Sequence, residues 1–132
     1  YICIYITIAT VMPKVVLVAT SAPELKGHPT GVWMEELSSP YYAFKEKGYD
    51  VVIASPKGGP IPIDQNSLGE GFFVDSAKKF LHDMEAVGAL SHSVELSTID
   101  FTSGSIDAIY MTGGHGTCTD FADNPVLKSA IE

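Results

Sequence analysis

Two short apolar runs, separated by a stretch with helical character, constrain this chain most. Residues 14–20 (KVVLVAT) and 50–55 (DVVIAS) are hydrophobic runs of strand length, as expected of strands buried on both faces. Between them, residues 41–48 (YYAFKEKG) are typical of a helix end, with lysines in the last turn and a glycine as stop signal. A strand, a helix and a strand in this order predict a parallel pair joined by a right-handed crossover.

The segment after the second run predicts irregular structure and then a helix. Residues 61–74 form an irregular excursion with a short apolar patch. Residues 75–88 predict a helix that Asp75 or Ser76 would cap. The apolar residues of this helix share one face at helical spacing: Phe80, Leu81, Met84 and Val87.

The last third of the chain predicts one more clear strand and one more helix. Residues 93–99 are ambiguous between loop and short strand, whereas residues 106–111 (IDAIYM) are a clear strand. A helix is expected to begin at Pro125, with Asn124 as its N-cap. A doubly wound sheet has about five strands, so the sequence predicts an α/β fold that is truncated, at Glu132, before its C-terminal strands.

Size and charge limit the classes of function. The length of 132 residues suits a single domain, which we expect over residues 12–132. The formal net charge is −8, and all eight basic residues are lysine. Such a chain repels a phosphate backbone and lacks the side chain best suited to bidentate phosphate contacts. The composition therefore predicts no nucleic-acid partner.

The cysteines and histidines give no sign of a disulfide framework or a metal centre. Cys3 and Cys118 lie in very different settings, which favours a reducing, cytoplasmic environment. His28, His82 and His92 show no metal-ligand spacing. We expect no metal site and no cofactor.

The first eleven residues (YICIYITIATV) need a separate interpretation. They are apolar and β-branched, but too short to span a bilayer as a helix. They have no basic region and no small-residue cleavage site, as a signal peptide would. The favoured interpretation is an apolar leader extraneous to the fold, and the alternative is an added edge strand. Neither interpretation predicts a membrane partner.

Two neighbouring carboxylates, Glu35 and Glu36, lie where the first strand is followed by the first helix. Ligands of open α/β sheets bind outside the carboxyl ends of the strands, so this position suits chemistry. One interpretation makes both residues solvated members of a first helical turn, where negative charge suits the helix dipole. The other brings one of them close to a nucleophile that sets its pKa.

A glycine turn, residues 113–116 (GGHG), directly follows the strand at 106–111. It is either a simple strand-to-loop turn or a source of exposed backbone amides that stabilise an oxyanion. It has neither the spacing of a dinucleotide fingerprint nor that of a phosphate loop. Cys118 lies just beyond the turn and is interpreted as an ordinary small residue, since nothing in the pattern supplies a base for it.

Several of these motifs together resemble the ThiJ/PfpI superfamily, which has a class I glutamine amidotransferase-like fold. Within it, the chain is most similar to the branch of heat-shock chaperones and glyoxalase III enzymes. The motifs that carry the resemblance are TGVWMEE (30–36) with PY (40–41), ASPKGG (54–59), PID (62–64) with Ser67, IDAI (106–109), and GGHG (113–116) with DF (120–121). The resemblance implies a flavodoxin-like, doubly wound parallel sheet.

The resemblance also implies a Cys-His-Glu site that acts on a small carbonyl substrate without a cofactor. Its acid would be Glu36, with Glu35 as the alternate, and its pocket would include Gly113, Gly114 and His115. In such enzymes a thiolate attacks an aldehyde, and methylglyoxal becomes lactate without glutathione (D-lactate dehydratase activity). The family's double role also allows a stress-response chaperone, and its fold allows amide hydrolysis of amidotransferase or peptidase type. A homodimer is compatible with the family.

One departure from the family pattern concerns the nucleophile. The family's cysteine follows the helix that begins near Pro125, in a motif like Ala-x-Cys-His-Gly, and this sequence ends at Glu132. We therefore expect the chain to be the N-terminal part of such a protein. It would carry the acid and the oxyanion side of the site and be inactive alone.

Overall fold

The protein is described by a computed structural model that covers residues 11–132. Apart from Val11, the apolar leader predicted at residues 1–11 lies outside the described residues. In chain order the elements are β1 (Lys14–Val18), β2 (Glu24–Leu25), β3 (His28–Pro29), α1 (Met34–Glu46), β4 (Asp50–Ser55), the 3₁₀ helix η1 (Gln65–Leu68), α2 (Asp75–His82), α3 (Met84–Ser91), β5 (Val94–Glu95), the 3₁₀ helix η2 (Leu96–Thr98), β6 (Ala108–Met111), α4 (Thr117–Asp120) and α5 (Pro125–Ile131).

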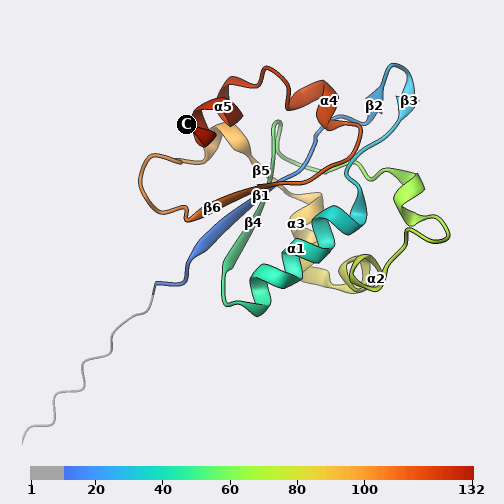
Figure 1. Ribbon diagram of the computed structural model, residues 1–132, viewed down its shortest axis with the longest axis horizontal. Coiled ribbons are helices and arrows are strands. Elements are labelled where there is room, and N and C mark those ends of the chain that lie inside the picture. The colour runs from blue at the N-terminus through green and yellow to red at the C-terminus, as the bar shows by residue number, and fades with distance from the viewer. Residues whose placement is uncertain (1–10) are drawn as a thin grey trace, which may run out of the picture.

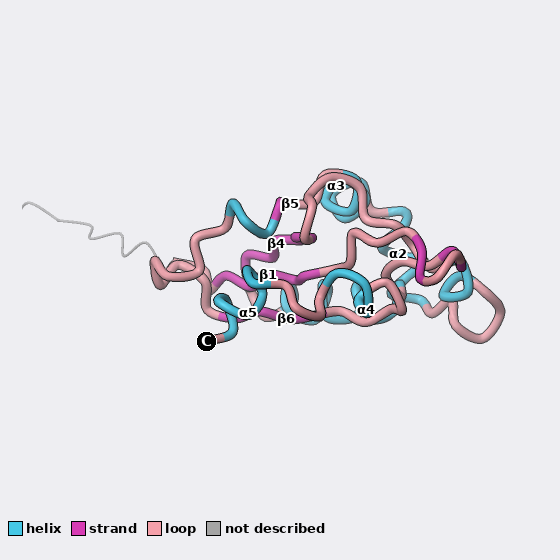
Figure 2. Tube along the Cα trace, turned by 90° about the horizontal axis from the view of Figure 1, so that it is seen from above, coloured by secondary structure: helices cyan, strands magenta, loops and turns pink. Residues whose placement is uncertain are grey.

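A four-stranded parallel sheet with the order β5-β4-β1-β6 forms the centre of the molecule. Figure 2 shows the four strands side by side in this order. The register pairs Val16 of β1 with Val52 of β4 on one side and with Ile109 of β6 on the other. The predicted strand–helix–strand unit and the doubly wound α/β fold are both confirmed.

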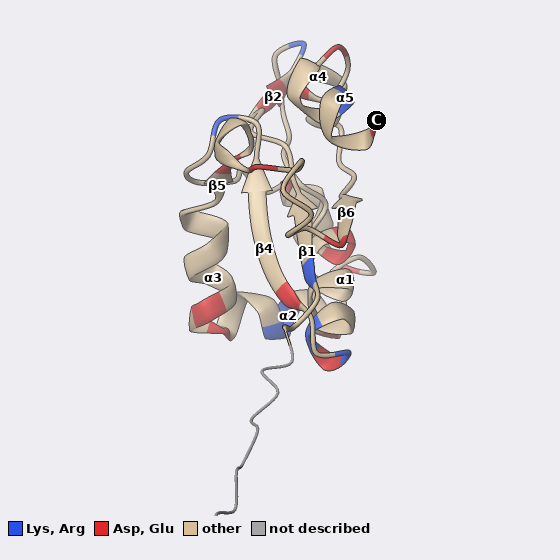
Figure 3. Ribbon diagram, turned by 90° about the vertical axis from the view of Figure 1, so that its left-hand side faces the viewer, with Lys and Arg blue, Asp and Glu red and all other residues tan. Residues whose placement is uncertain are grey.

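Strand β1 separates two hydrophobic clusters because its successive side chains point to opposite faces of the sheet. Val15 and Leu17 belong to the larger cluster, which α1, α2 and α3 cover. Val16 and Val18 belong to a smaller cluster, to which η2 and α5 contribute. Both faces of β1 are therefore buried, as its apolar run predicts. Figure 3 shows the middle of β4 free of charged residues as well.

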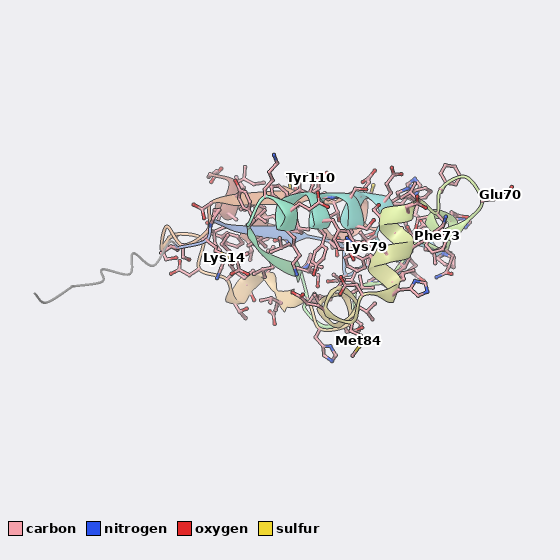
Figure 4. All side chains as sticks on the ribbon, turned by 90° about the horizontal axis from the view of Figure 1, so that it is seen from below. Lys14, Glu70, Phe73, Lys79, Met84 and Tyr110 are labelled. Atoms are coloured by element: carbon pink, nitrogen blue, oxygen red, sulfur yellow. The ribbon has the colours of Figure 1, made fainter. Side chains whose placement is uncertain are left out.

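The helix predicted over residues 75–88 is wrong in extent and in its apolar face. The chain forms two helices, α2 and α3, separated by Asp83 in an extended conformation. The Asp83 carboxylate accepts hydrogen bonds from the backbone N–H groups of Glu85 and Ala86 and thus caps α3. Met84 is consequently 91% exposed and points away from the molecule (Figure 4).

Other boundaries differ from the sequence prediction in smaller ways. Neither Asp75 nor Ser76 caps α2, because Val74 occupies the cap position and Asp75 is already helical. The ambiguous segment 93–99 contains a strand of two residues, β5, followed by η2. The Asn124 cap is confirmed, since its side chain accepts from the N–H groups of Val126 and Leu127.

Two elements have no counterpart in the sequence prediction. The hairpin of β2 and β3 interrupts the path from β1 to α1, and the short helix α4 follows the glycine turn. In Figure 1 both lie at the same end of the sheet, beyond the carboxyl ends of β1 and β6. They are therefore part of the surroundings of the candidate site.

Candidate active site

The candidate site lies where the strand order of the sheet reverses. From β1 the chain passes through α1 to β4 and then β5, and only afterwards returns to β6 on the other side of β1. Open α/β sheets bind ligands at such a reversal, outside the carboxyl ends of the strands. Here the two segments that meet are the start of α1 and the glycine turn after β6, and the N–H of Trp33 donates to the carbonyl of Gly113 at 3.2 Å.

Glu36, and not Glu35, faces the glycine turn. Both residues lie in the first turn of α1. A methyl group placed on Gly113 would collide with the Oε2 atom of Glu36, so the carboxylate lies directly against this glycine. Both carboxylates are exposed, but Glu35 contributes to no contact of this kind. The structure thus distinguishes between the two carboxylates that the sequence left as alternatives.

A cavity of about 280 Å³ connects the predicted site residues. Its lining comprises Trp33, Glu36, Gly114, His115 and Cys118. Glu36, Gly114 and His115, which the resemblance assigned to one pocket, therefore do lie together. Gly113 adjoins the cavity through its contact with Glu36. A space of this volume is small compared with common drug-sized ligand sites, which suits a small substrate.

The glycine turn presents backbone amides at the cavity. Within residues 11–132, no protein atom accepts a hydrogen bond from the N–H of Gly113 or Gly114. Gly114 has φ +120°, a conformation that glycine adopts most readily, and a side chain there would collide with the carbonyl of Gly31. Chain packing therefore requires glycine at this corner, and two N–H groups are left available to a ligand.

The turn is held in place from the side of β1. Asp120, at the end of α4, accepts hydrogen bonds from the Thr20 hydroxyl at 2.9 Å and from the Ser21 N–H at 2.7 Å. The N–H of Thr112 donates to the carbonyl of Val18 at 2.9 Å, which continues the ladder between β6 and β1. These contacts fix both ends of the loop that carries the glycines.

The aromatic wall of the cavity comes from Trp33. This residue occupies the N-cap position of α1, and its ring meets that of Phe72 edge to face, with the centroids 5.3 Å apart. Phe72 extends from the irregular excursion between η1 and α2. The irregular excursion predicted at residues 61–74 thus contributes the aromatic side chain that packs against Trp33.

Two further residues lie at this location without having been assigned to the pocket from the sequence. Cys118, interpreted from the sequence as an ordinary small residue, is an exposed free thiol that lines the cavity with Glu36. Within residues 11–132 no side chain hydrogen-bonds to its sulfur, so the geometry provides no base for it. Asp64 is a buried carboxylate near His115, and it entered the sequence analysis only as part of a motif.

The described residues contain no group of three or more His, Cys, Asp or Glu side chains arranged to hold a metal ion. In the same part of the chain, no helix combines the length and the apolar character needed to cross a bilayer. The residues that line the site offer a carboxylate, an imidazole, a thiol and backbone amides.

Comparison with known families identifies the chain. The sequence model of a family described as ThiJ/PfpI family-like matches residues 28–132. The chain belongs to the ThiJ/PfpI family. The resemblance noted in the sequence is thus confirmed, and the matched range contains Glu36, the glycine turn and Asp64.

Individual ThiJ/PfpI relatives agree with this assignment. Glyoxalase 3 of Candida albicans is 27% identical over 120 residues, which are 89% of this chain and 50% of that protein. The crystal structure of glyoxalase III from Candida albicans matches with a TM-score of 0.78 and 28% identity, over 92% of this chain and 52% of that one. The Rapid Encystment Protein 24 kDa of Francisella tularensis matches with a TM-score of 0.82 and 34% identity, over 91% of this chain and 52% of that one. The chain spans about half the length of these relatives.

Proposed function

We propose that the protein containing this chain is a glyoxalase III-type enzyme that converts methylglyoxal to lactate without glutathione. The observation that carries the proposal is the Glu36 carboxylate, which lies against Gly113 and shares a small cavity with Gly114 and His115. The similarity to glyoxalase III proteins supports the same reaction class. The substrate would be a small carbonyl compound that fits a cavity of about 280 Å³.

In this proposal each group has a distinct task. A cysteine thiolate adds to the aldehyde carbon to give a hemithioacetal hydroxyl, and the N–H groups of Gly113 and Gly114 stabilise the oxyanion that develops on the neighbouring carbonyl oxygen during the rearrangement. Glu36 exchanges a proton with the sulfur and so controls how much thiolate is present. The hemithioacetal then rearranges to a thioester of lactate, and water releases lactate and the thiol.

The proposal assigns the attacking thiolate to a cysteine that these 132 residues do not contain. Cys118 lines the cavity but has no hydrogen-bonded base within the described residues, so it is not given this task. We therefore expect the 132-residue chain to form no lactate on its own. Turnover by this chain alone would contradict the assignment and would direct attention to Cys118.

The test compares two adjacent carboxylates in the full-length protein. Glu36→Gln removes the carboxylate that faces Gly113, and we expect kcat/KM for methylglyoxal to fall by about 100-fold or more. Glu35→Gln is the matched control, since it changes the neighbouring exposed carboxylate and should leave the rate within about twofold of wild type. Full activity of Glu36→Gln would refute the proposal.

A stress-response holdase is a second candidate, and the apolar residues that residues 11–132 leave exposed beside β6 and α5 are its candidate client surface. Met111 is 49% exposed and Ile131 is 61% exposed, and both line one cavity of about 610 Å³. An apolar surface of this kind can hold unfolded segments of a client protein. Suppression of client aggregation that is unchanged in Glu36→Gln but lost in Met111→Ser would support this function; no suppression by the wild type would exclude it.

A further inference from the structure

A buried carboxylate, Asp64, lies beside the cavity and has no task in the proposed chemistry. Asp64 is only 2% exposed. Its Oδ1 atom accepts from the N–H and the side-chain amide of Asn66, both at 3.0 Å, and its Oδ2 atom accepts from the Thr30 hydroxyl at 2.9 Å. The Nδ1 atom of His115 is 3.9 Å from the same Oδ2 atom. Among the described residues, His115 is the one basic side chain within ion-pair distance of Asp64.

The backbone around Asp64 holds this carboxylate in a fixed position. The N–H of Asp64 donates to the carbonyl of Val32 at 3.0 Å, and its carbonyl accepts from the N–H and hydroxyl of Ser67. Residues 62–64 thereby bind the segment that leads into α1 and carries Trp33. A buried carboxylate is costly unless its partners are well placed. Asp64 thus caps η1 with both carboxylate oxygens hydrogen-bonded, and it also lies next to the one imidazole that lines the cavity.

The orientation of the His115 ring connects Asp64 with the cavity. The ring lines the cavity while its Nδ1 atom faces Asp64. Which ring nitrogen of a neutral histidine carries the proton is set by the hydrogen bond that the other side of the ring makes. A carboxylate near Nδ1 favours the proton on Nδ1, so the unprotonated Nε2 is left for the cavity. At 3.9 Å the two atoms are within ion-pair distance but are not hydrogen-bonded, and the His115 side chain is 75% exposed, so the ring has to approach Asp64 when the substrate binds.

We propose that Asp64 is a positioning residue that holds His115 in the Nδ1-protonated form, so that Nε2 accepts a hydrogen bond from a hydroxyl of the bound substrate adduct. The inference rests on the proposed function, because the hydroxyl belongs to the hydrate or hemithioacetal of a 2-oxoaldehyde. It deepens that function by assigning the two oxygens of such a substrate to different groups. The carbonyl oxygen beside the adduct carbon meets the amides of the glycine turn, and the adduct hydroxyl meets His115 on the same wall of the cavity.

The first test measures the protonated nitrogen of His115 directly and needs no activity. Nitrogen-15 NMR of the 132-residue chain at about pH 8.5, above the usual titration range of histidine, reports the tautomer of each ring. The chain has four histidines, and the signal that disappears in His115→Gln identifies the ring of interest. We expect His115 to carry its proton on Nδ1. A proton on Nε2 in the wild-type chain overturns the proposal without any further variant.

A matched pair of variants then separates Asp64 from its surroundings. Asp64→Asn replaces the carboxylate by an amide of the same shape, and we expect the His115 proton to lose its preference for Nδ1. Thr30→Val removes another partner of the same oxygen but keeps Asp64 and His115, so the tautomer should stay as in the wild type. An unchanged tautomer in folded Asp64→Asn overturns the positioning role.

The second test measures activity of the full-length protein with methylglyoxal. We expect kcat/KM to fall by about 100-fold in His115→Gln and by about tenfold in Asp64→Asn. The double variant should be no slower than His115→Gln, because Asp64 acts through His115. Additive losses overturn the proposal. His92→Gln, at the exposed C-cap of α3 and outside the cavity lining, should keep wild-type activity.

The two tests distinguish failure of this inference from failure of the proposed function. A wild-type protein that forms no lactate refutes the glyoxalase assignment, and an Nδ1 proton on His115 would then still establish the Asp64–His115 pair. Conversely, lactate formation that requires Glu36 but not His115 keeps the proposed function and refutes the inference.

Discussion

The two faces of the central sheet differ in how completely they are covered. On one face α1, α2 and α3 enclose a large cluster around Leu17, which includes Phe80 and Tyr41. On the other face η2 and α5 cover a smaller cluster around Val18, which includes Leu127. At the edge of the sheet, the last two residues of β6 are exposed. Within residues 11–132, the first face therefore buries the larger part of the apolar core.

The sharpest test of this difference compares a large buried side chain on each face. Phe80→Ala removes a fully buried ring from the first face, and we expect the free energy of unfolding to fall by about 4 kcal/mol. Leu127→Ala on the second face should cost about 2 kcal/mol, because neighbouring cavities let the site relax. Urea unfolding of both variants measures the two values. Equal losses would show that the two faces are packed equally well.

The glycine turn at the carboxyl end of β6 gives a second comparison, with a smaller effect on stability. Gly114→Ala forces a side chain against the carbonyl of Gly31 at φ +120°, and we expect a loss of about 3 kcal/mol. Gly113→Ala meets only the flexible carboxylate of Glu36 and should cost less than about 1 kcal/mol. Thermal unfolding distinguishes the two.

The glycine variants also distinguish an effect on stability from an effect on activity. Gly113→Ala displaces the Glu36 carboxylate, so in the full-length protein it should lower lactate formation about as strongly as Glu36→Gln, although it stays folded. Retained activity in Gly113→Ala would show that the position of Glu36 against the turn has no role in the reaction.

Tyr42, on α1, is expected to make the free energy of unfolding depend on pH in the alkaline range. Burial raises the pKa of Tyr42, and the hydrogen bond from its hydroxyl to Asp83 raises it further. Because the folded value lies above the ordinary value of 10.0, this contribution to stability is complete below pH 10 and is lost as the pH rises through the folded value. We expect Tyr42→Phe to flatten the decrease in unfolding free energy above about pH 10. An unchanged alkaline slope would contradict the assignment.

The smallest expected effect is on the free energy of unfolding at acidic pH, and it comes from Asp83. The N–H of Ala86 and then the Tyr42 hydroxyl lower the pKa of Asp83 below its ordinary value of 3.8. This contribution is present above that ordinary value and is lost as the pH falls through the folded value. Asp83→Asn retains a capping side chain but does not titrate, so acid unfolding should become less steep. If Asp83→Asn unfolds in acid as steeply as the wild type, the acid sensitivity comes from other residues.

The parts of the fold that sequence predicted correctly are those with repeated hydrophobic signals. Strand β4 has the boundaries predicted for it, residues 50–55, because the apolar run at residues 51–54 indicates a strand. The prediction of one helix over residues 75–88 is wrong because the Asp83 side chain accepts hydrogen bonds from the backbone N–H groups that follow it. These bonds begin a new helix. The spacing of the hydrophobic residues gives no information about such a side-chain hydrogen bond.

The site was predictable only as far as neighbouring elements could be assigned to one edge of the sheet. Glu36 and the glycine turn follow different strands that end at the same edge, so their proximity could be inferred. The contributions of Asp64 and Cys118 depend on the path of loops, which no periodicity describes. The choice between Glu35 and Glu36 likewise depends on the rotation of α1 about its axis.

Trp33 makes the cavity observable by its own emission. It is the single tryptophan of the chain, and its indole forms one wall of the space that Glu36 and His115 share. Any molecule that settles there replaces solvent beside the indole, so the fluorescence of the unlabelled protein reports occupancy directly. Candidate ligands can therefore be ranked by titration before any turnover assay exists.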